Sequence, residues 1–145
     1  IVQSPGYVTI MNEMAHDARV IPLDGRPHLD DRLRVWNGDS RGHWEGDTLV
    51  IDTTNFSSKS DFMGSHEHLR LTETITRTGP AILNYEFTVN DPTMWTAPWT
   101  AMILLKAKNE MIYEFACHEG NEAIPDMLRG HRFEEREAAA KSRSK

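Results

Sequence analysis

Cysteine and long apolar runs are what this 145-residue chain has least of. Its single cysteine, Cys117, excludes an internal disulfide framework and a multi-cysteine zinc ribbon. The longest apolar run is Ala101 to Leu105, far shorter than the roughly 20 residues that a membrane-spanning helix needs. We therefore expect no membrane insertion.

Positive charge is also scarce. Lys and Arg total 16 against 22 Asp and Glu, which gives a formal net charge of −6. This balance argues against a general phosphate-backbone binder, so we expect no nucleic-acid partner. With 39% hydrophobic and 26% charged residues, the composition is that of a soluble globular protein of one domain.

Alternation of apolar and polar residues with a period of two dominates the chain and indicates β-strands. Even-numbered residues from Val8 to Val20 form the apolar face of one long strand or a bent pair, which Pro22 ends. Gly46 and Asp47 predict the turn of a hairpin over 42–53, and 55–65 is predicted to be a loop. Further strands are predicted at 32–36, 69–77, 83–89, 100–106 and 111–117.

About eight short strands at such spacings are typical of an antiparallel barrel or sandwich. We expect residues 1–121 to form one antiparallel β domain and residues 122–145 a partly helical extension with a frayed end. Within the extension, Pro125 is predicted to interrupt helical turns over 122–128. Residues 133–141 favour a helix that nearly lacks an apolar face.

Four sequence blocks, in order, carry a resemblance to a known family. They are HDARVIPLDGRPH from His16, GHWEGDTLVIDT from Gly42, YEFTVNDP from Tyr85 with WTAPWT from Trp95, and YEFACHEGN from Tyr113. In them the chain resembles a large family of exported bacterial proteins with no established reaction, over nearly its whole length up to Asn121.

The resemblance implies a β-rich fold and a periplasmic or secreted location, and it supplies no catalytic residue. Family members usually start earlier than the equivalent of Ile1. Because the chain also opens on Ile1 rather than Met, we expect it to be the core of a longer exported precursor.

The first candidate groups lie near the start of the chain. His16 and Asn12 share the mostly apolar face of the first strand, where an imidazole and an amide could orient a polar ligand group or move a proton. The alternative is a buried histidine satisfied by a neighbouring strand. Asp24, Arg26 and His28 lie on a proline-fixed turn that suits either a binding loop or a structural corner with a local ion pair.

Carboxylates in the middle of the chain give candidates for acid and base chemistry. His43 and Glu45 share one side of a strand and could form an acid and base pair, or flank a solvated turn. Glu73 interrupts an apolar face. Burial would raise its pKa unless Arg77 or another cation pairs with it, so it is a candidate base or cavity ligand. The alternative is a twist at the strand end that returns Glu73 to solvent.

Seven histidines raise the question of a metal. His66 and His68 have a spacing that can ligate zinc or copper, but they lie in a predicted polar loop. Cys117 and His118 are adjacent, so their side chains point to opposite faces of a strand and cannot readily engage each other. We expect no cofactor, with zinc or copper as the open alternative if the strands bring together His16, His28, His43 and His118.

We expect a mainly β chain that forms an antiparallel barrel similar in kind to the lipocalin-like, or calycin-like, ligand-enclosing barrels. An open sandwich is the alternative. Tryptophans and tyrosines could line its pocket or pack its core. The predicted ligand-binding residues are Asn12, His16, Arg26, His28, Trp44, Tyr85, Trp95, Trp99, Tyr113 and His118.

The leading functional hypothesis is a small-molecule carrier or sensor, in which aromatic side chains pack the ligand and Asn12, His16 and Arg26 orient its polar end. A lyase, isomerase or hydrolase is the second. Its catalytic residues would be His16 or His43 with Glu73 or Glu45, with or without a metal. A structural or interaction domain is the third, and the oligomeric state stays open.

Overall fold

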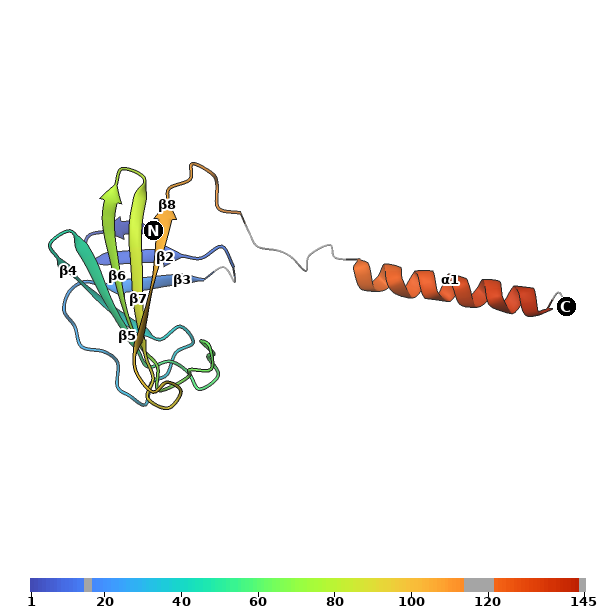
Figure 1. Cartoon of the computed structure of the whole chain (residues 1–145), viewed down its shortest axis with the longest axis horizontal. Coiled ribbons are helices and arrows are strands. Elements are labelled where there is room, and N and C mark those ends of the chain that lie inside the picture. The colour runs from blue at the N-terminus through green and yellow to red at the C-terminus, as the bar shows by residue number, and fades with distance from the viewer. Residues whose placement is uncertain (15–16, 114–121, 144–145) are drawn as a thin grey trace. The chain divides into compact units, whose positions relative to one another are not determined.

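The structure is a computed structural model that describes residues 1–14, 17–113 and 122–143. It divides into two compact units, Ile1–Tyr113 and Glu114–Lys145. The described part of the first unit holds eight strands in two antiparallel sheets, and that of the second holds one helix (Figure 1). The chain is therefore mainly β, as the sequence predicted.

The smaller sheet has the order β1-β2-β3 and consists of β1 (Val2–Ser4), β2 (Tyr7–Met11) and β3 (Ala18–Pro22). All neighbours are antiparallel. β3 ends at Pro22, because proline has no N–H to give to a ladder. The first predicted strand region thus forms a hairpin, whereas β1 was not predicted.

The hairpin also corrects the predicted inward face. Ile10 pairs with Arg19 and Val8 with Ile21, so the inward residues are even-numbered in β2 and odd-numbered in β3. Val8 and Ile21 are buried, whereas Val20 is exposed. The sequence prediction continued one alternation from Val8 to Val20. In the structure, the residues that face inward change from even-numbered to odd-numbered between β2 and β3.

The larger sheet has the order β4-β5-β6-β7-β8, again with antiparallel neighbours. Its strands are β4 (Asp39–Glu45), β5 (Thr48–Thr54), β6 (Arg70–Gly79), β7 (Ile82–Asn90) and β8 (Trp99–Lys106). The predicted hairpin is confirmed as β4 and β5, and Gly46 in its turn has a φ of 59°, which favours glycine. β6, β7 and β8 match three further predicted strands.

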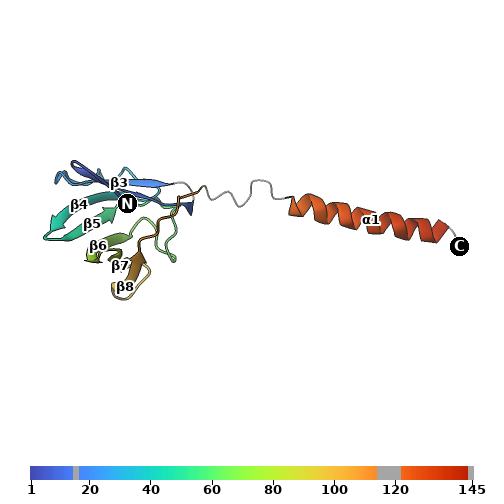
Figure 2. The ribbon, with the colours of Figure 1, turned by 90° about the horizontal axis from the view of Figure 1, so that it is seen from above.

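A cluster of buried aliphatic side chains joins the two sheets: Val8 and Ile21 from the smaller one and Leu49, Ile51 and Ile75 from the larger one. Figure 1 shows the strands of the smaller sheet running across those of the larger sheet. Figure 2 shows the smaller sheet close to β4, with the larger sheet falling away from it toward β8. The sheets thus pack tightly on one side and diverge on the other.

Gly42 lies in β4 where the sheets are closest. A Cβ atom at this position would approach Leu23 Cδ2 to 2.8 Å and Ile21 Cγ2 to 2.9 Å, closer than side chains tolerate. Glycine therefore permits the close packing of the smaller sheet on β4.

Two predicted strands differ from the structure. Residues 32–36 form no strand, only an isolated bridge between Val35 and Phe56. This segment is held by side chains instead, because Asn55 Nδ2 donates hydrogen bonds to the carbonyls of Leu29, Asp30 and Leu33 at 3.1 Å each. Of the predicted strand 111–117, residues 111–113 are not a strand, and the rest lies outside the described residues.

In the described residues the two sheets share no ladder and close no barrel, and β4 and β8 are the edges of the larger sheet. The arrangement fits the open sandwich that was the alternative prediction. The β8 edge is strongly apolar, since the side chains of its residues 102–105 are all exposed.

The second unit contains α1 (Ala123–Arg143), a single helix of 21 residues. The predicted interruption is wrong, because Pro125 lies in the first turn, where its missing N–H would have had no partner within the helix. No described helix combines the length and the apolar character needed to cross a membrane.

Candidate functional site

A groove opens between the sheets where they diverge, and we call it the central groove. It has a volume of about 430 Å³, within the range of small-molecule pockets. Its walls are mostly apolar, with a few polar groups among them. The lining residues are Ile1, Ile10, Asn12, Arg19, Asn37, Phe56, Leu71, Glu73, Ile75, Tyr85, Ile103 and Leu105.

Glu73 is the most buried charged group in this groove. It sits in β6 on the same face as Leu71 and Ile75, so the strand's pleat turns its carboxylate toward the smaller sheet. Arg19 of β3 meets it with two parallel hydrogen bonds, Nη1 to Oε2 at 2.7 Å and Nη2 to Oε1 at 2.8 Å. The side chains of Arg19 and Glu73 are 18% and 2% exposed. Glu73 is thus buried and paired, and of the two possibilities, Arg77 or another cation, its partner is another cation, Arg19.

Tyr85 of β7 completes this cluster, which we call the Arg19–Glu73–Tyr85 cluster. Its hydroxyl donates a hydrogen bond to Glu73 Oε1 at 2.8 Å, and its ring stacks on Phe87 with centroids 5.6 Å apart. Burial raises the pKa of Tyr85, and the negative charge of Glu73 and the hydrogen bond to it add to the rise. Tyr85 therefore stays a neutral hydrogen-bond donor.

The hydrogen bonds of the cluster limit its chemistry. Both oxygens of Glu73 already accept hydrogen bonds, so a substrate proton has no ready access to them. Arg19 uses two of its N–H groups on Glu73, which leaves others to donate to a bound molecule. The cluster can therefore donate hydrogen bonds to a polar group, whereas neither oxygen of Glu73 is free to abstract a proton.

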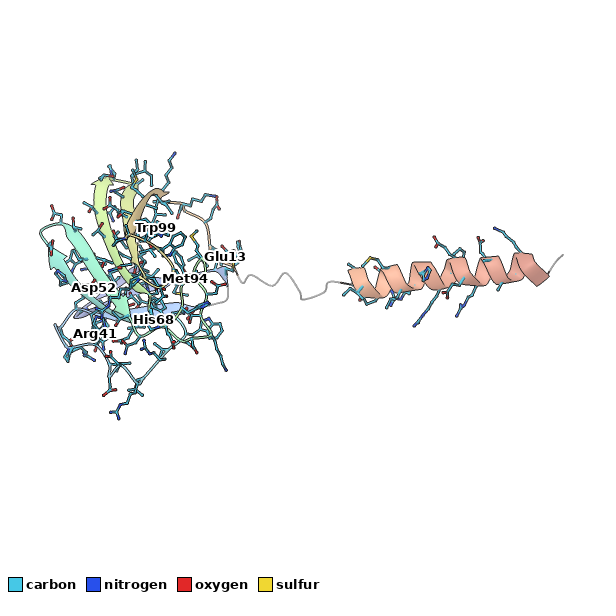
Figure 3. All side chains as sticks on the ribbon, turned by 60° about the horizontal axis from the view of Figure 1, so that its bottom comes forward. Glu13, Arg41, Asp52, His68, Met94 and Trp99 are labelled. Atoms are coloured by element: carbon cyan, nitrogen blue, oxygen red, sulfur yellow. The ribbon has the colours of Figure 1, made fainter. Side chains whose placement is uncertain are left out.

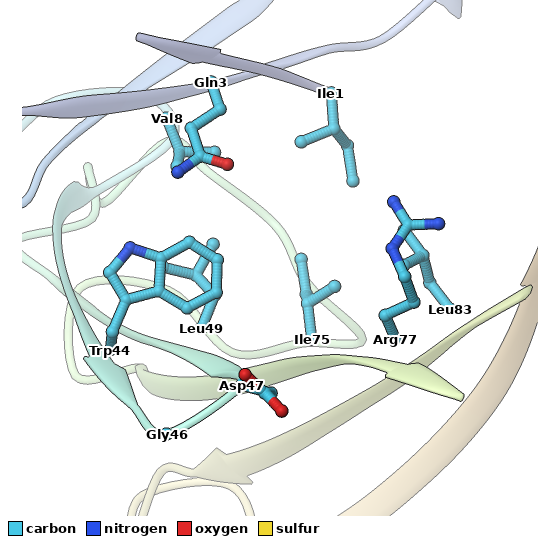
Figure 4. Close-up of a pocket in the computed structure, with 10 residues that line it drawn as sticks. All are labelled: Ile1, Gln3, Val8, Trp44, Gly46, Asp47, Leu49, Ile75, Arg77 and Leu83. Atoms are coloured by element: carbon cyan, nitrogen blue, oxygen red, sulfur yellow. The ribbon is translucent and has the colours of Figure 1, made fainter. Parts of the chain in front are cut away.

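A second opening, which we call the hairpin groove, lies at the β4–β5 turn and has a volume of about 980 Å³. Figure 4 shows Ile1, which precedes β1, and Val8 of the smaller sheet facing Trp44 and Ile75 of the larger sheet across it. Ile1 and Ile75 line the central groove as well, so the two openings adjoin. Trp44 is the predicted ligand residue that lies here.

His43 and Glu45 lie on the opposite face of β4 from Trp44. Their side chains are 53% and 68% exposed, with His43 Nε2 at 3.0 Å from Glu45 Oε1. The predicted pairing of the two side chains is present, on the outer face of the sheet. Neither of them lines the central groove or the hairpin groove.

The turn that contains Arg26 forms a local ion pair. Arg26 Nε donates to both oxygens of Asp24 at 2.8 Å, and its guanidinium also contacts Tyr7. The Arg26 hydrogen bond lowers the pKa of Asp24 to about 2. This is the structural corner that was one of the two predictions for the turn.

His28 belongs to a separate network at the start of β4. Its Nδ1 lies 2.9 Å from Asp39 Oδ2, which also accepts a hydrogen bond from the Leu29 amide. Arg41 Nη1 donates to Asp39 Oδ1 at 2.6 Å, and Arg41 Nε donates to the Pro27 carbonyl. Asp39 therefore anchors the irregular segment that follows β3, and sequence reasoning missed both Asp39 and Arg41.

The predicted residues Trp95 and Trp99 pack together at the end of the larger sheet away from the β4–β5 turn. Trp99, labelled in Figure 3, meets Phe87 edge to face at 5.8 Å and Trp95 at 5.7 Å. Trp95 Nε1 donates to Ser65 Oγ at 3.1 Å. These rings pack around a small core cluster, whereas Tyr113 is exposed.

Of the remaining candidate residues, one lines the central groove and the others lie outside the residues that the structure describes. Asn12 lines the central groove. His16, Cys117 and His118 lie outside the described residues. Over 1–14, 17–113 and 122–143, no three side chains of His, Cys, Asp or Glu come together in a way that could hold a metal ion.

Fold and site together define a two-sheet antiparallel β protein with a mostly apolar groove and a polar cluster inside it. Comparisons with family models, with curated proteins and with solved structures find no match for the chain. The central groove and its polar cluster therefore carry the functional argument.

Proposed function

We propose that the protein binds a small molecule in the central groove, as a carrier or sensor. One observation carries this proposal: a polar cluster, Arg19–Glu73–Tyr85, sits within walls that are mostly apolar. Small-molecule sites combine an apolar lining with a few fixed polar groups in this way. The apolar walls hold the body of the ligand, and the Arg19 N–H groups orient its polar end.

The arrangement favours binding over acid and base catalysis. Glu73 is held by Arg19 and Tyr85, and the exposed pair of His43 and Glu45 lies away from both grooves. General acid and base catalysis needs a group within hydrogen-bond reach of the substrate proton. The described residues offer no such pair inside the central groove.

The test uses N-phenyl-naphthylamine, an uncharged fluorescent probe with apolar rings. We expect the probe to bind with one site per chain and its fluorescence to rise on leaving water. Ile103→Trp should weaken this binding about tenfold, because Ile103 lines the groove and a larger side chain there occupies the space of the probe.

Met102→Trp is the matched control for this substitution. Met102 is the neighbour of Ile103 in β8, so its side chain points to the opposite face of the sheet. Both positions are exposed, so both variants should fold. No saturable binding by the wild type, or equal loss in the two variants, contradicts the proposal.

A closed, ligand-enclosing barrel remains part of the proposal for the fold. It requires a further strand to pair with β8, which lies at the edge of the larger sheet. Hydrogen exchange of the β8 amides that do not bond to β7 tests this requirement. Slow exchange at those amides supports a further strand, and exchange as fast as in an open edge contradicts it.

Export to the periplasm or the medium is likewise a proposal, supported by the four sequence blocks that resemble an exported family. Fractionation of cells that express the gene with its native upstream sequence tests it. Recovery of the protein in the cytoplasm would contradict export.

A further inference from the structure

The central groove contains a full positive charge and a full negative charge that cancel each other. Arg19 and Glu73 are joined by two parallel hydrogen bonds, and Tyr85 adds a neutral donor to the same carboxylate. Among the described residues, no other charged side chain lines this groove. The net charge that a bound molecule meets there is therefore close to zero.

Charged ligands gain little from such a site. An anion would lose its hydration shell on entering the groove, and the attraction of Arg19 is already offset by Glu73. A cation would need the Glu73 oxygens, but that side chain is 2% exposed and both oxygens are occupied. Spare Arg19 N–H groups can still donate to a neutral oxygen.

We propose that the central groove selects uncharged apolar molecules over anionic ones, and that Glu73 is the residue that rejects anions. This inference rests on the proposed binding function and names the class of ligand. Glu73 acts as a specificity residue by neutralising Arg19. It need not contact the ligand.

Two probes that differ by one charged group test the selectivity. Anilinonaphthalene sulfonate has the ring system of N-phenyl-naphthylamine plus a sulfonate. We expect the wild-type protein to bind the uncharged probe about tenfold more tightly than the sulfonate. The difference should change little with salt concentration, because the groove presents no net charge.

Glu73→Gln should abolish the preference. The amide keeps the shape of the side chain and an oxygen for Tyr85 and Arg19, but it removes the negative charge that offsets Arg19. We expect this variant to bind the sulfonate about tenfold more tightly than the wild type does, and to lose that gain in high salt. Glu45→Gln makes the same change of net charge on the outer face of β4 and should alter neither affinity.

A second variant covers the case in which Glu73→Gln does not fold. Arg19→Met with Glu73→Leu removes both charges together, and such replacements of buried pairs are often tolerated. We expect the double variant to retain its affinity for the uncharged probe and to gain no affinity for the sulfonate. Circular dichroism confirms that each variant is folded. Weaker probe fluorescence when Ile103→Trp is added to a variant locates the probe in the groove.

The outcomes separate the two proposals. If neither probe binds the wild type, the proposed function fails. If the uncharged probe binds but the wild type does not discriminate, or a folded Glu73→Gln gains no affinity for the sulfonate, the binding function stands and the selectivity is overturned. A double variant that gains affinity for the sulfonate overturns the selectivity as well.

Discussion

Two arginine–carboxylate pairs in the β unit have similar hydrogen bonds and opposite surroundings. Arg19 and Glu73 come from different sheets and meet in the central groove, with side chains 18% and 2% exposed. Arg26 and Asp24 lie two residues apart on a turn, 48% and 44% exposed. Distances alone would make the two pairs equivalent, whereas their exposure makes their energetic roles different.

The two pairs differ in how strongly each charge depends on its partner. A buried charge that loses its partner has neither water nor an opposite charge to stabilise it. Exposed charges keep their hydration when the pair breaks, so such pairs contribute little to stability. The groove pair therefore holds the two sheets to one arrangement, and the turn pair only shapes a local corner.

Arg19→Met has the largest expected effect. It leaves Glu73 buried between the sheets without a cation and should lower the free energy of unfolding by about 3–5 kcal/mol, measured by urea denaturation at neutral pH. Arg19→Met with Glu73→Leu removes the unpaired charge and should recover most of this loss. If the single variant lies within about 1 kcal/mol of the wild type, the groove pair does not depend on burial.

Tyr85→Phe should have an intermediate effect. It removes one hydrogen bond to a buried carboxylate and should cost about 2 kcal/mol in the same measurement, because hydrogen bonds to charged groups are stronger than neutral ones. Tyr113→Phe removes a hydroxyl from an exposed ring and serves as the control. Equal unfolding midpoints for the two variants would contradict the role given to Tyr85.

Because the pKa of Tyr85 is raised in the folded protein, the free energy of unfolding should depend on pH under alkaline conditions. The unfolded chain loses this proton near pH 10, whereas the folded protein keeps it to higher pH. Above pH 10 the unfolded state therefore binds fewer protons, and this contribution to stability falls with rising pH by up to about 1.4 kcal/mol per unit. Below that pH the contribution is constant.

The difference in unfolding free energy between wild type and Tyr85→Phe should therefore shrink as the pH rises above about 10. Urea denaturation of both proteins over this range measures it. A difference that is constant with pH would show that Tyr85 has the same pKa in the folded and unfolded states.

Arg26→Met should have the smallest effect on stability. The unfolding midpoint in urea should match that of the wild type, because both charges of the pair are solvated. The local effect should be clear: the pKa of Asp24 should rise from about 2 toward its ordinary 3.8, measured by NMR titration of the carboxyl carbon. A large loss of stability would show that the turn pair is not merely local.

Local patterns in the sequence predicted much of the larger sheet. Gly46 and Asp47 mark a hairpin turn by their own conformational preferences, and Glu73 stands out because Leu71 and Ile75 flank it on one face. Its partner could not be found in this way. The sequence pattern placed the even-numbered residues from Val8 to Val20 on the apolar face, whereas in β3 the inward residues are odd-numbered and include Arg19.

Other features depend on tertiary contacts that no short pattern contains. Alternation separates Trp44 from His43 and Glu45, but the position of the smaller sheet decides which face is inside. Asp39 binds His28 across an irregular segment, so its role has no periodic signal. Such contacts become visible only once the two sheets are placed together.

Amide NMR spectra of the wild-type protein during titration with N-phenyl-naphthylamine test the central claim most directly. The account predicts saturable shifts that gather on the central groove, at Arg19, Ile75, Tyr85 and Ile103, and unchanged signals at His43 on the outer face of β4. Shifts confined to other surfaces, or none at concentrations that saturate the fluorescence, would contradict the assignment of the central groove as the binding site.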